Sequence, residues 1–253
     1  MAQNFRQGEI LRVAQAEGKV LVEDLANRFG VTLQTVRRDL TELCDAGQLT
    51  RVYGGAVLTS GVANIGYQER RGLHPEEKDR IGRLCAAAIP DGASLFLNIG
   101  TTTEAVARAL LGHRSLMVVT NNLNAANILA QNAGCEVIVA GGVLRRSDGG
   151  LVGDMTMEVV RQFKVDVAVI GASAIDEAGD LLDYDVREVK VAQAILAQAR
   201  KRFLVADRSK FTRVAPVRIA SLAEVDQFFT NAAPPAKVRA ACAAWGTEIV
   251  VAP

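Results

Sequence analysis

Residues 22–58 read VEDLANRFGVTLQTVRRDLTELCDAGQLTRVYGGAVL, and this stretch decides the fold of the N-terminal part of the chain. A helix over 22–29 is expected to end at Gly30, because glycine readily adopts the left-handed conformation of a helix cap. After Val31 a second helix begins, with Thr32 as its N-cap. Apolar residues recur along it at helical spacing, at Val36, Leu40 and Leu43. Two helices joined by so short a glycine-containing turn are typical of a helix-turn-helix.

The outer face of the second helix carries side chains suited to contacts with DNA. Glutamine and arginine make bidentate contacts with base edges, while arginine, threonine and the helix N-terminus hold phosphates. The chain then alternates apolar and polar residues around Gly54-Gly55, which predicts a tight hairpin, the wing of a winged helix domain. The candidate DNA-binding residues are Thr32, Gln34, Thr35, Arg37 and Arg38 on the helix and Arg51 and Tyr53 on the wing.

Upstream, residues 4–17 predict an amphipathic first helix, whose apolar stripe is expected to contain Phe5, Ile10, Leu11 and Ala14. Net charge adds nothing to the argument for DNA, because 29 basic against 28 acidic side chains leave the chain at +1. Positive charge for DNA must therefore be concentrated locally. A helix-turn-helix domain that binds only protein is an alternative interpretation of the same pattern.

Downstream, the chain changes character twice. Residues 59–74 are richer in glycine and polar residues without a clean period, which indicates a linker after a first domain over 1–58. Pro75 suits the first turn of a helix that is expected to run to about Ile89. Beyond it, short apolar strands alternate with helices, so 75–253 predicts an α/β domain with a largely parallel sheet covered on both faces.

Polar residues gather where the predicted strands of the α/β domain end. Ligands of such sheets bind at the carboxyl ends of the strands, and a glycine followed by hydroxyls at a helix start makes a phosphate cradle. Lys210 supplies the one obvious cation. The candidate effector-binding residues are Gly100, Thr101, Thr102, Thr103, Asn121, Asn122, Gly141, Gly142, Asp207 and Lys210.

Several classes of protein are disfavoured. There is no G-x-x-x-x-G-K-[ST] or G-x-G-x-x-G loop for a nucleotide cofactor, and His74 and His113 cannot form a histidine triad or a multi-histidine metal site. The four scattered cysteines fit reduced thiols. No apolar run is long enough for a membrane span and the N-terminus lacks signal-peptide features, so we expect a cytoplasmic protein without cofactor, metal or membrane contact.

The string GKVLVEDLANRFGVTLQTVRRDLTELCDAGQLTRVYGGAV resembles the DNA-binding domain of the DeoR family of bacterial transcription regulators. NIGTTTEAVARALL, VTNNLNAANILA, AGGVLRRSDGGLVG, REVKVAQAIL and ADRSKF resemble the sensor domain of that family, so the likeness covers residues 3–253. The resemblance implies a sensor fold similar to ribose-5-phosphate isomerase, a phosphorylated effector and a homo-oligomer, dimer or tetramer. In the commonest version of the family, the effector releases the repressor from double-stranded operator DNA.

Segments TNNLNAAN, RSDGGLVG and NAAPPAKV resemble the branch of the family that responds to glycerol-3-phosphate, which makes that compound the favoured effector. The rival from another class is a sugar-phosphate isomerase or deaminase with an appended DNA-binding module. In that case Lys210 with Asp183, Asp185 or Glu188 would transfer protons on a phosphosugar. A third alternative, a protein-interaction adaptor, predicts no DNA binding even at low salt.

Overall fold

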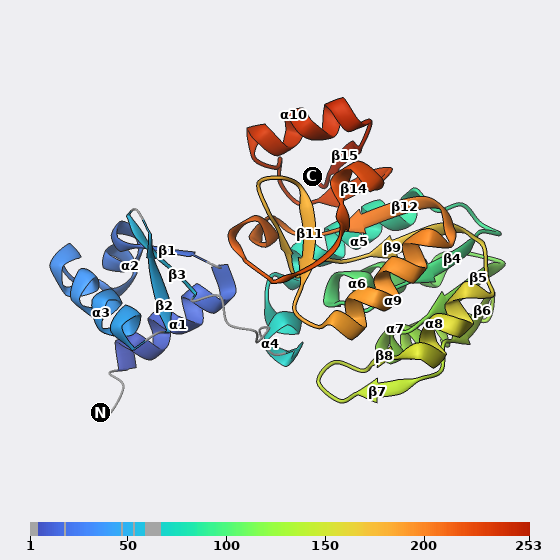
Figure 1. Cartoon of the computed structure of the whole chain (residues 1–253), viewed down its shortest axis with the longest axis horizontal. Helices are drawn as coiled ribbons and strands as arrows, with labels where there is room; N and C mark the ends of the chain where they lie inside the picture. Colours follow the sequence, from blue (N-terminus) through green and yellow to red (C-terminus); the bar gives the residue numbers. More distant parts are fainter. Residues whose placement is uncertain (1–4, 18, 47, 53, 59–66) are drawn as a thin grey trace.

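The computed structural model describes residues 5–17, 19–46, 48–52, 54–58 and 67–253. These residues form a small N-terminal domain, blue in Figure 1, and a larger α/β domain, cyan to red. Each domain has its own buried core, since one apolar cluster runs from Ile10 to Ala56 and the others begin at Ile81. Within the described residues, no helix is long and apolar enough to cross a membrane.

The small domain packs helices against an antiparallel sheet. Its elements are α1 (Phe5–Glu17), β1 (Lys19–Leu21), α2 (Val22–Phe29), α3 (Leu33–Asp45), β2 (Leu49–Val52) and β3 (Gly55–Leu58). The strands pair in the order β1-β3-β2. Ile10 and Ala14 are buried as predicted, but Phe5 is 84% exposed and lies outside the core. Strand β1 has no sequence signal, because a strand this short shows no alternation.

The turn and the hairpin form as the glycines indicate, with one shift. Gly30 caps α2 with φ 61°, and its N–H donates to the Ala26 carbonyl. The hairpin turns one residue earlier than expected, because Gly55 already pairs with Val52 in the β2–β3 ladder. Gly55 is needed for close packing instead, since a Cβ there would lie 1.9 Å from the Val20 carbonyl oxygen.

The larger domain is built on a parallel sheet, as predicted. Its strands lie in the order β15-β14-β12-β9-β4-β5-β6. Their bounds are β4 (Ser94–Leu97), β5 (Leu116–Thr120), β6 (Cys135–Val139), β9 (Val165–Ile170), β12 (Ala199–Val205), β14 (Gln227–Thr230) and β15 (Glu248–Val251). The chain order reverses between β4 and β9, and this switch point is where open α/β sheets form a crevice for ligands.

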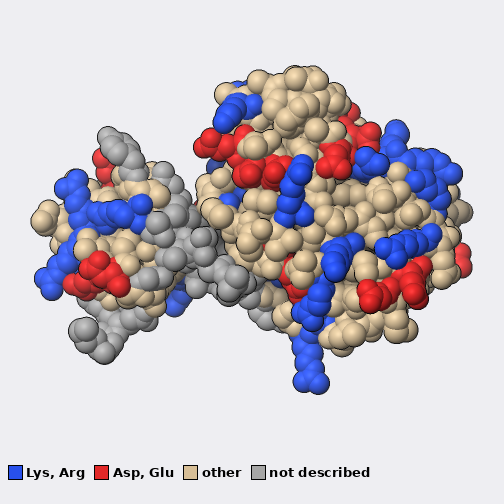
Figure 2. All heavy atoms as spheres, viewed as in Figure 1, with Lys and Arg blue, Asp and Glu red and all other residues tan. Residues whose placement is uncertain are grey.

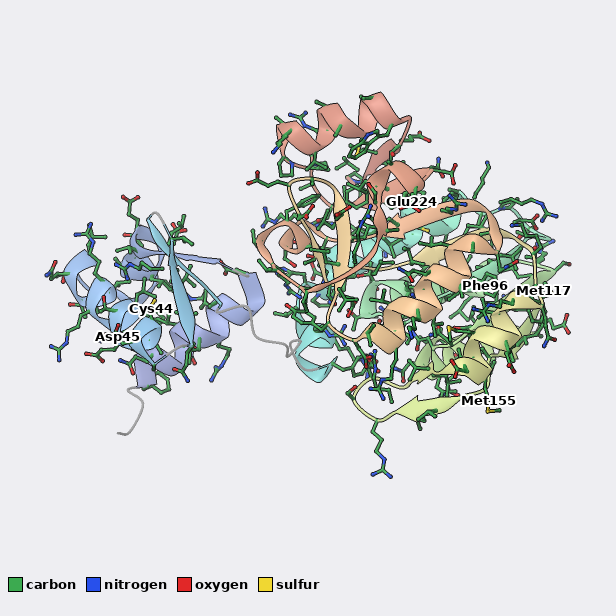
Figure 3. All side chains as sticks on the ribbon, viewed as in Figure 1. Cys44, Asp45, Phe96, Met117, Met155 and Glu224 are labelled. Atoms are coloured by element: carbon green, nitrogen blue, oxygen red, sulfur yellow. The ribbon has the colours of Figure 1, made fainter. Side chains whose placement is uncertain are left out.

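Helices cover both faces of this sheet. One face packs α5 (Pro75–Ala87), α6 (Thr101–Ala109) and α7 (Leu123–Leu129), and the other packs α8 (Asp154–Arg161), α9 (Val186–Ala197) and α10 (Ala236–Trp245). Phe96 of β4 is fully buried between the layers, whereas Met155 of α8 is 66% exposed (Figure 3). A Cβ on Gly82 would lie 2.6 Å from the Ala105 carbonyl carbon, so α5 and α6 meet backbone to backbone.

Shorter elements join these layers. They are the hairpin β7 (Val143–Arg145) and β8 (Gly150–Val152), the antiparallel sheet of β10 (Ala174–Ile175), β11 (Asp180–Asp183) and β13 (Val217–Ser221), and the single turns η1 (Leu110–Gly112), η2 (Arg208–Thr212) and η3 (Leu222–Glu224). The sequence pattern predicted none of them, because elements of two to five residues leave too little periodicity to detect.

The end of the predicted linker is folded. Within 59–74, helix α4 (Tyr67–Gly72) forms, and the Tyr67 hydroxyl donates to both carboxylate oxygens of Glu104 on α6 at 3.0 Å. Residues 59–66 lie outside the described residues. Helix α4 therefore packs on the larger domain immediately before α5 and contacts α6, the helix that begins after β4.

Candidate functional site

Helix α3 presents a polar face on the small domain. Thr32 caps it, because its hydroxyl accepts from the Thr35 N–H at 3.2 Å. Of the remaining candidate side chains, Gln34, Arg37 and Arg38 are exposed and Thr35 is half-buried. The opposite face is buried through Val36, Leu40 and Leu43, as predicted.

Polar contacts hold α3 on α1. Arg6 forms a bidentate pair with Asp39, a carboxylate that is only 4% exposed, with distances of 2.5 and 3.1 Å. Next to it, Arg38 pairs with Glu42 at 3.0 Å. The guanidinium of Arg37 makes no hydrogen bond or ion pair with any residue that the structure describes. The guanidinium of Arg37 on this anchored helix is therefore available to a ligand.

Arg37 and the wing share one concave surface. Arg37, Leu33, Arg51 and Gly54 line a groove of about 580 Å³ between α3 and the hairpin. Figure 2 shows basic side chains gathered at the end of the small domain that carries α2 and α3. Tyr53, the remaining wing candidate, lies outside the described residues. The local positive charge that DNA binding requires is therefore present, although the whole chain is nearly neutral.

In the larger domain, the loop after β4 leads into α6 at the switch point. Gly100 is the N-cap of α6 with φ 148°, a conformation that favours glycine. The amides of a first helical turn have no partner within the helix and attract anions. Thr101 is half-buried and Thr102 is buried beside them. The Thr103 hydroxyl is already committed, because it is 2.7 Å from both the Asn98 and Gly100 carbonyl oxygens and shapes the loop.

The same domain buries two lysines, Lys78 and Lys210. Burial, followed by the charge of Arg213, lowers the pKa of Lys210 to about 7, and Asp207 opposes the shift. Burial likewise lowers the pKa of Lys78 on α5 to about 8. Both lysines respond to the charge of Arg70 as well. Charges act on each other's pKa only over short distances. Lys78, Lys210, Arg70 and Arg213 therefore form one group of cations.

Asp207 is the principal acid among these cations. It follows β12 and begins η2, where its carboxylate accepts the Ser209 N–H at 2.9 Å. Burial acts to raise its pKa, but the charge of Lys210 and the hydrogen bonds of Ser209 prevail and lower the pKa to about 2. Other acids also act on these cations, since the charge of Glu104 supports the ionised form of Lys78 and Asp148 pairs with Arg70. The group is therefore a mixed cluster of buried charges, and its lysines suit an anionic ligand.

The asparagines after β5 each retain one unused polar atom. Asn121 donates to the Leu151 carbonyl at 3.1 Å, but its Oδ1 has no hydrogen-bond partner among the residues that the structure describes. Asn122 caps α7 by accepting from the Asn124 and Ala125 amides, while its Nδ2 has no partner in the same part of the chain. A buried polar atom without a partner is costly unless a ligand or water satisfies it.

Gly141 and Gly142 are not brought into this group. They follow the edge strand β6, and the Gly141 carbonyl accepts from the Thr156 hydroxyl of α8 at 2.6 Å. A Cβ on Gly142 would lie 2.1 Å from the same hydroxyl oxygen and 2.9 Å from the Val152 carbonyl oxygen. Their geometry therefore serves the packing of α8 rather than a contact with the buried cations.

The two domains match known sequence families in the same order. A DeoR-like helix-turn-helix domain matches residues 6–62, and a DeoR C terminal sensor domain matches residues 73–232. The chain belongs to the DeoR family. Its small domain is therefore a DNA-binding helix-turn-helix domain, and its larger domain is a sensor domain.

Relatives match along nearly the whole chain. The glycerol-3-phosphate regulon repressor of Escherichia coli (strain K12) is 44% identical over 238 residues, which cover 94% of each chain. The protein of that name from Haemophilus influenzae is 45% identical, covering 92% of this chain and 91% of its own. The transcriptional repressor CsqR of Escherichia coli (strain K12) is 40% identical, covering 93% and 90%. These relatives are transcriptional repressors.

Solved structures resemble the DeoR chain more distantly. D-ribose-5-phosphate isomerase in complex with phospho-erythronic acid shares 17% identity and a TM-score of 0.41 over 54% of each chain. The eIF2B beta subunit of Chaetomium thermophilum shares 16% identity and a TM-score of 0.48, covering 82% of this chain and 57% of its own. The α/β fold of the sensor domain is established by its own strand order.

Two acids that would transfer protons in the alternative enzyme are paired with arginines in this DeoR sensor domain. Asp185 pairs with Arg187 at 2.9 Å, and Glu188 pairs with Arg145 at 2.5 Å. Burial, followed by Asp183, raises the pKa of Glu188 to about 7. The acid whose charge opposes the lowered pKa of Lys210 is Asp207 instead.

Sequence patterns missed much of the cationic group. Lys78 carried a usable signal, because it shares the spacing of the buried Ile81, Gly82 and Cys85, and a lysine on an apolar helix face is unusual. Arg70 was assigned to a linker that had no period. Arg213 follows η2, a turn too short to predict.

Proposed function

We propose that this chain is a transcriptional repressor that leaves its operator when the sensor domain binds a small phosphorylated polyol or sugar. The observation that carries the proposal is the cluster of the buried Lys78 and Lys210 with Arg70 and Arg213, in which Lys78 of α5 also feels the charge of Glu104 on α6. Glycerol-3-phosphate is the favoured effector, because relatives 44% and 45% identical are named after its regulon.

In this proposal the phosphate rests on the amides of Gly100, Thr101 and Thr102, with Lys210 as its counter-charge. Asn121 and Asn122 offer their unused Oδ1 and Nδ2 to hydroxyls of the effector. Asp207 holds Lys210 in place and accepts a hydrogen bond from an effector hydroxyl. The site would thus read both the charge and the polyol character of the ligand.

The operator is bound by α3 and the wing. Thr32, Thr35, Arg38 and Arg51 hold phosphates, and Gln34 and Arg37 read base edges in the major groove, with Tyr53 on the backbone. Two copies of the domain would engage half-sites roughly 34–36 Å apart, or a multiple of that spacing. A dimer or tetramer is consistent with exposed apolar side chains on one part of the sensor domain, at Val143, Leu144 and Met155.

Effector and operator are coupled through two arrangements of the small domains. The effector shifts their equilibrium only by as much as it binds one arrangement more tightly than the other. We propose regulation without turnover, because fold similarity carries no chemistry by itself and the acids Asp185 and Glu188 are engaged by arginines.

The test is a panel of phosphorylated three- to six-carbon compounds against the purified protein. A ligand at a hundred times its Kd should add about 2.7 kcal/mol to the free energy of unfolding, read as a higher Tm. Glycerol-3-phosphate is expected to give the shift, to release operator DNA, and to be recovered unchanged, with plain glycerol as the control. No shift across the panel would refute the sensor proposal, and product formation would favour the enzyme.

A further inference from the structure

Helix α4 forms a direct connection between the sensor site and the segment that follows the DNA-binding domain. Besides the contact of Tyr67 with Glu104, the Arg70 guanidinium lies 3.4 Å from Asp148, and the Lys78 ammonium donates to the Arg70 carbonyl. Of the contacted residues, Glu104 lies on α6, Lys78 lies on α5 and Asp148 lies in the turn between β7 and β8. A short helix outside the sheet is thus tied to the helix and the lysine that form the site.

Arg70 itself is incompletely satisfied. Its side chain is only 16% exposed, and its Nε is buried without a hydrogen-bond partner in the described parts of the chain. Its acid, Asp148, is already held by Arg145 at 2.5 and 2.9 Å, so the 3.4 Å contact with Arg70 is the weakest that this carboxylate makes with an arginine. A buried guanidinium in that situation has donors to offer to a ligand.

The charge of Arg70 also points to a ligand. It acts as a like charge on both Lys78 and Lys210, so it lies within electrostatic reach of the proposed phosphate position. A phosphate would attract each of these cations and so offset their mutual repulsion. The planar fork of arginine also suits bidentate binding of phosphate oxygens.

We propose that Arg70 is a ligand of the effector phosphate, so that the segment between the domains supplies part of the sensor site. This inference rests on the proposed function and deepens it. When phosphate enters beside Lys210, Arg70 turns from Asp148 to the phosphate oxygens and draws α4 with it. Because α4 begins nine residues after Leu58 ends β3, the first structural consequence of binding arises in the segment that leads to the DNA-binding domain.

The experiment compares Arg70→Ala with Arg71→Ala in the full chain by calorimetric titration of glycerol-3-phosphate. Arg71 is the matched control, because it is exposed on the same helix and its loss removes the same charge. Arg70→Ala should weaken binding about tenfold to a hundredfold, the range for hydrogen bonds to charged groups. Arg71→Ala should stay within about threefold of the wild type, as for an exposed charge.

A second ligand and a second variant test whether a loss of affinity comes from the lost contact with phosphate. Inorganic phosphate, which shares only the charged group, should lose affinity in the same proportion. Arg70→Gln keeps much of the side-chain length without the charge and should show the same loss if Arg70→Ala does not fold. Cooperative thermal melts and retained operator binding without effector verify that each variant is folded.

The outcomes distinguish failure of the proposed function from failure of the proposed role of Arg70. If the wild type binds none of the phosphorylated compounds, the proposed function fails and the role of Arg70 falls with it. Where the wild type binds but the Arg70 variants bind equally well, only the role of Arg70 is overturned. Weaker binding confined to the Arg70 variants, with a matching rise in the concentration that releases operator, supports the inference.

Discussion

The two domains hold the cations of their candidate sites in opposite surroundings. On α3 and the wing, Arg37 and Arg51 are exposed around an open groove and bury none of their charge. At the sheet switch point, Lys78 and Lys210 are buried among further cations, and their pKa values fall to about 8 and 7. A long polyanion can be held at an open surface, whereas a small phosphorylated molecule must be enclosed by its site.

The difference teaches where each site draws its energy. Exposed charges cost the fold little and act through release of counterions from DNA. Buried charges destabilise the unliganded domain and are compensated when an anion arrives, so the sensor site holds strain that binding relieves. Salt, substitution and pH should therefore affect the two sites differently.

Salt should separate the domains most strongly. If Arg38 and Arg51 from each of two subunits contact phosphates, operator affinity should fall about a hundredfold between 50 and 200 mM salt. Effector affinity should change by less than about threefold, because buried pairs are weakly screened. Filter binding and calorimetry across this range measure both. Equal slopes would mean that the buried site is open to solvent.

Lys210→Met should disable the sensor while sparing the operator site. Losing a buried counter-charge is expected to weaken glycerol-3-phosphate binding about a hundredfold or more. Operator affinity should persist but no longer respond to the effector. A gel-shift titration with and without effector distinguishes this from simple misfolding, in which operator binding would fail as well.

The same variant should be more stable than the wild type. The folded pKa of Lys210 is about 7, below the value of 10.5 for an unperturbed lysine, so the unfolded chain binds more protons between these values. Wild-type stability should therefore rise with pH across that window, and the rise should be smaller in Lys210→Met, which keeps only the contribution of Lys78. Urea unfolding at pH 7 and pH 9 checks the sign. A steeper rise in the variant would contradict the burial of this charge.

Arg37→Ala should show the reverse pattern. With an operator fragment that contains one half-site, loss of a bidentate base contact should cost about 1–3 kcal/mol, a roughly tenfold to hundredfold loss of affinity. Stability should change by no more than about 0.5 kcal/mol, because the side chain is exposed. Competition with mismatched operator fragments measures the specificity, and Arg12→Ala on the exposed surface of α1 serves as control. Unchanged sequence preference would show that another residue reads the bases.

The smallest effect concerns protons. Between about pH 7 and pH 10 the effector phosphate is already a dianion, since its second pKa is about 6. Binding should raise the lowered pKa values of Lys210 and Lys78, so the complex should take up about one proton and weaken as pH rises. Calorimetry in buffers of different ionisation enthalpy measures the uptake, and it should shrink in Lys210→Met. Proton release would contradict the assignment.

Much of the recognition domain followed from local sequence. The caps at Gly30 and Thr32 and the buried face of Val36, Leu40 and Leu43 act within one or two helical turns, so their spacing is visible in the chain. Asp39 was not anticipated, because its partner Arg6 comes from another helix. The strands of the large sheet were predicted for a similar reason, since strands buried on both faces are short apolar runs.

By itself, therefore, the sequence determined the helix-turn-helix, the parallel α/β class and the polar loops at the strand ends, all of which depend on near neighbours. Only the tertiary structure decided that Lys78, Lys210 and Arg213 lie near Asp207, and that Gly141 and Gly142 pack on α8. The physical reason is that charge and burial act through space. A lysine acquires a pKa near neutrality from groups that are distant along the chain, and no local pattern records them.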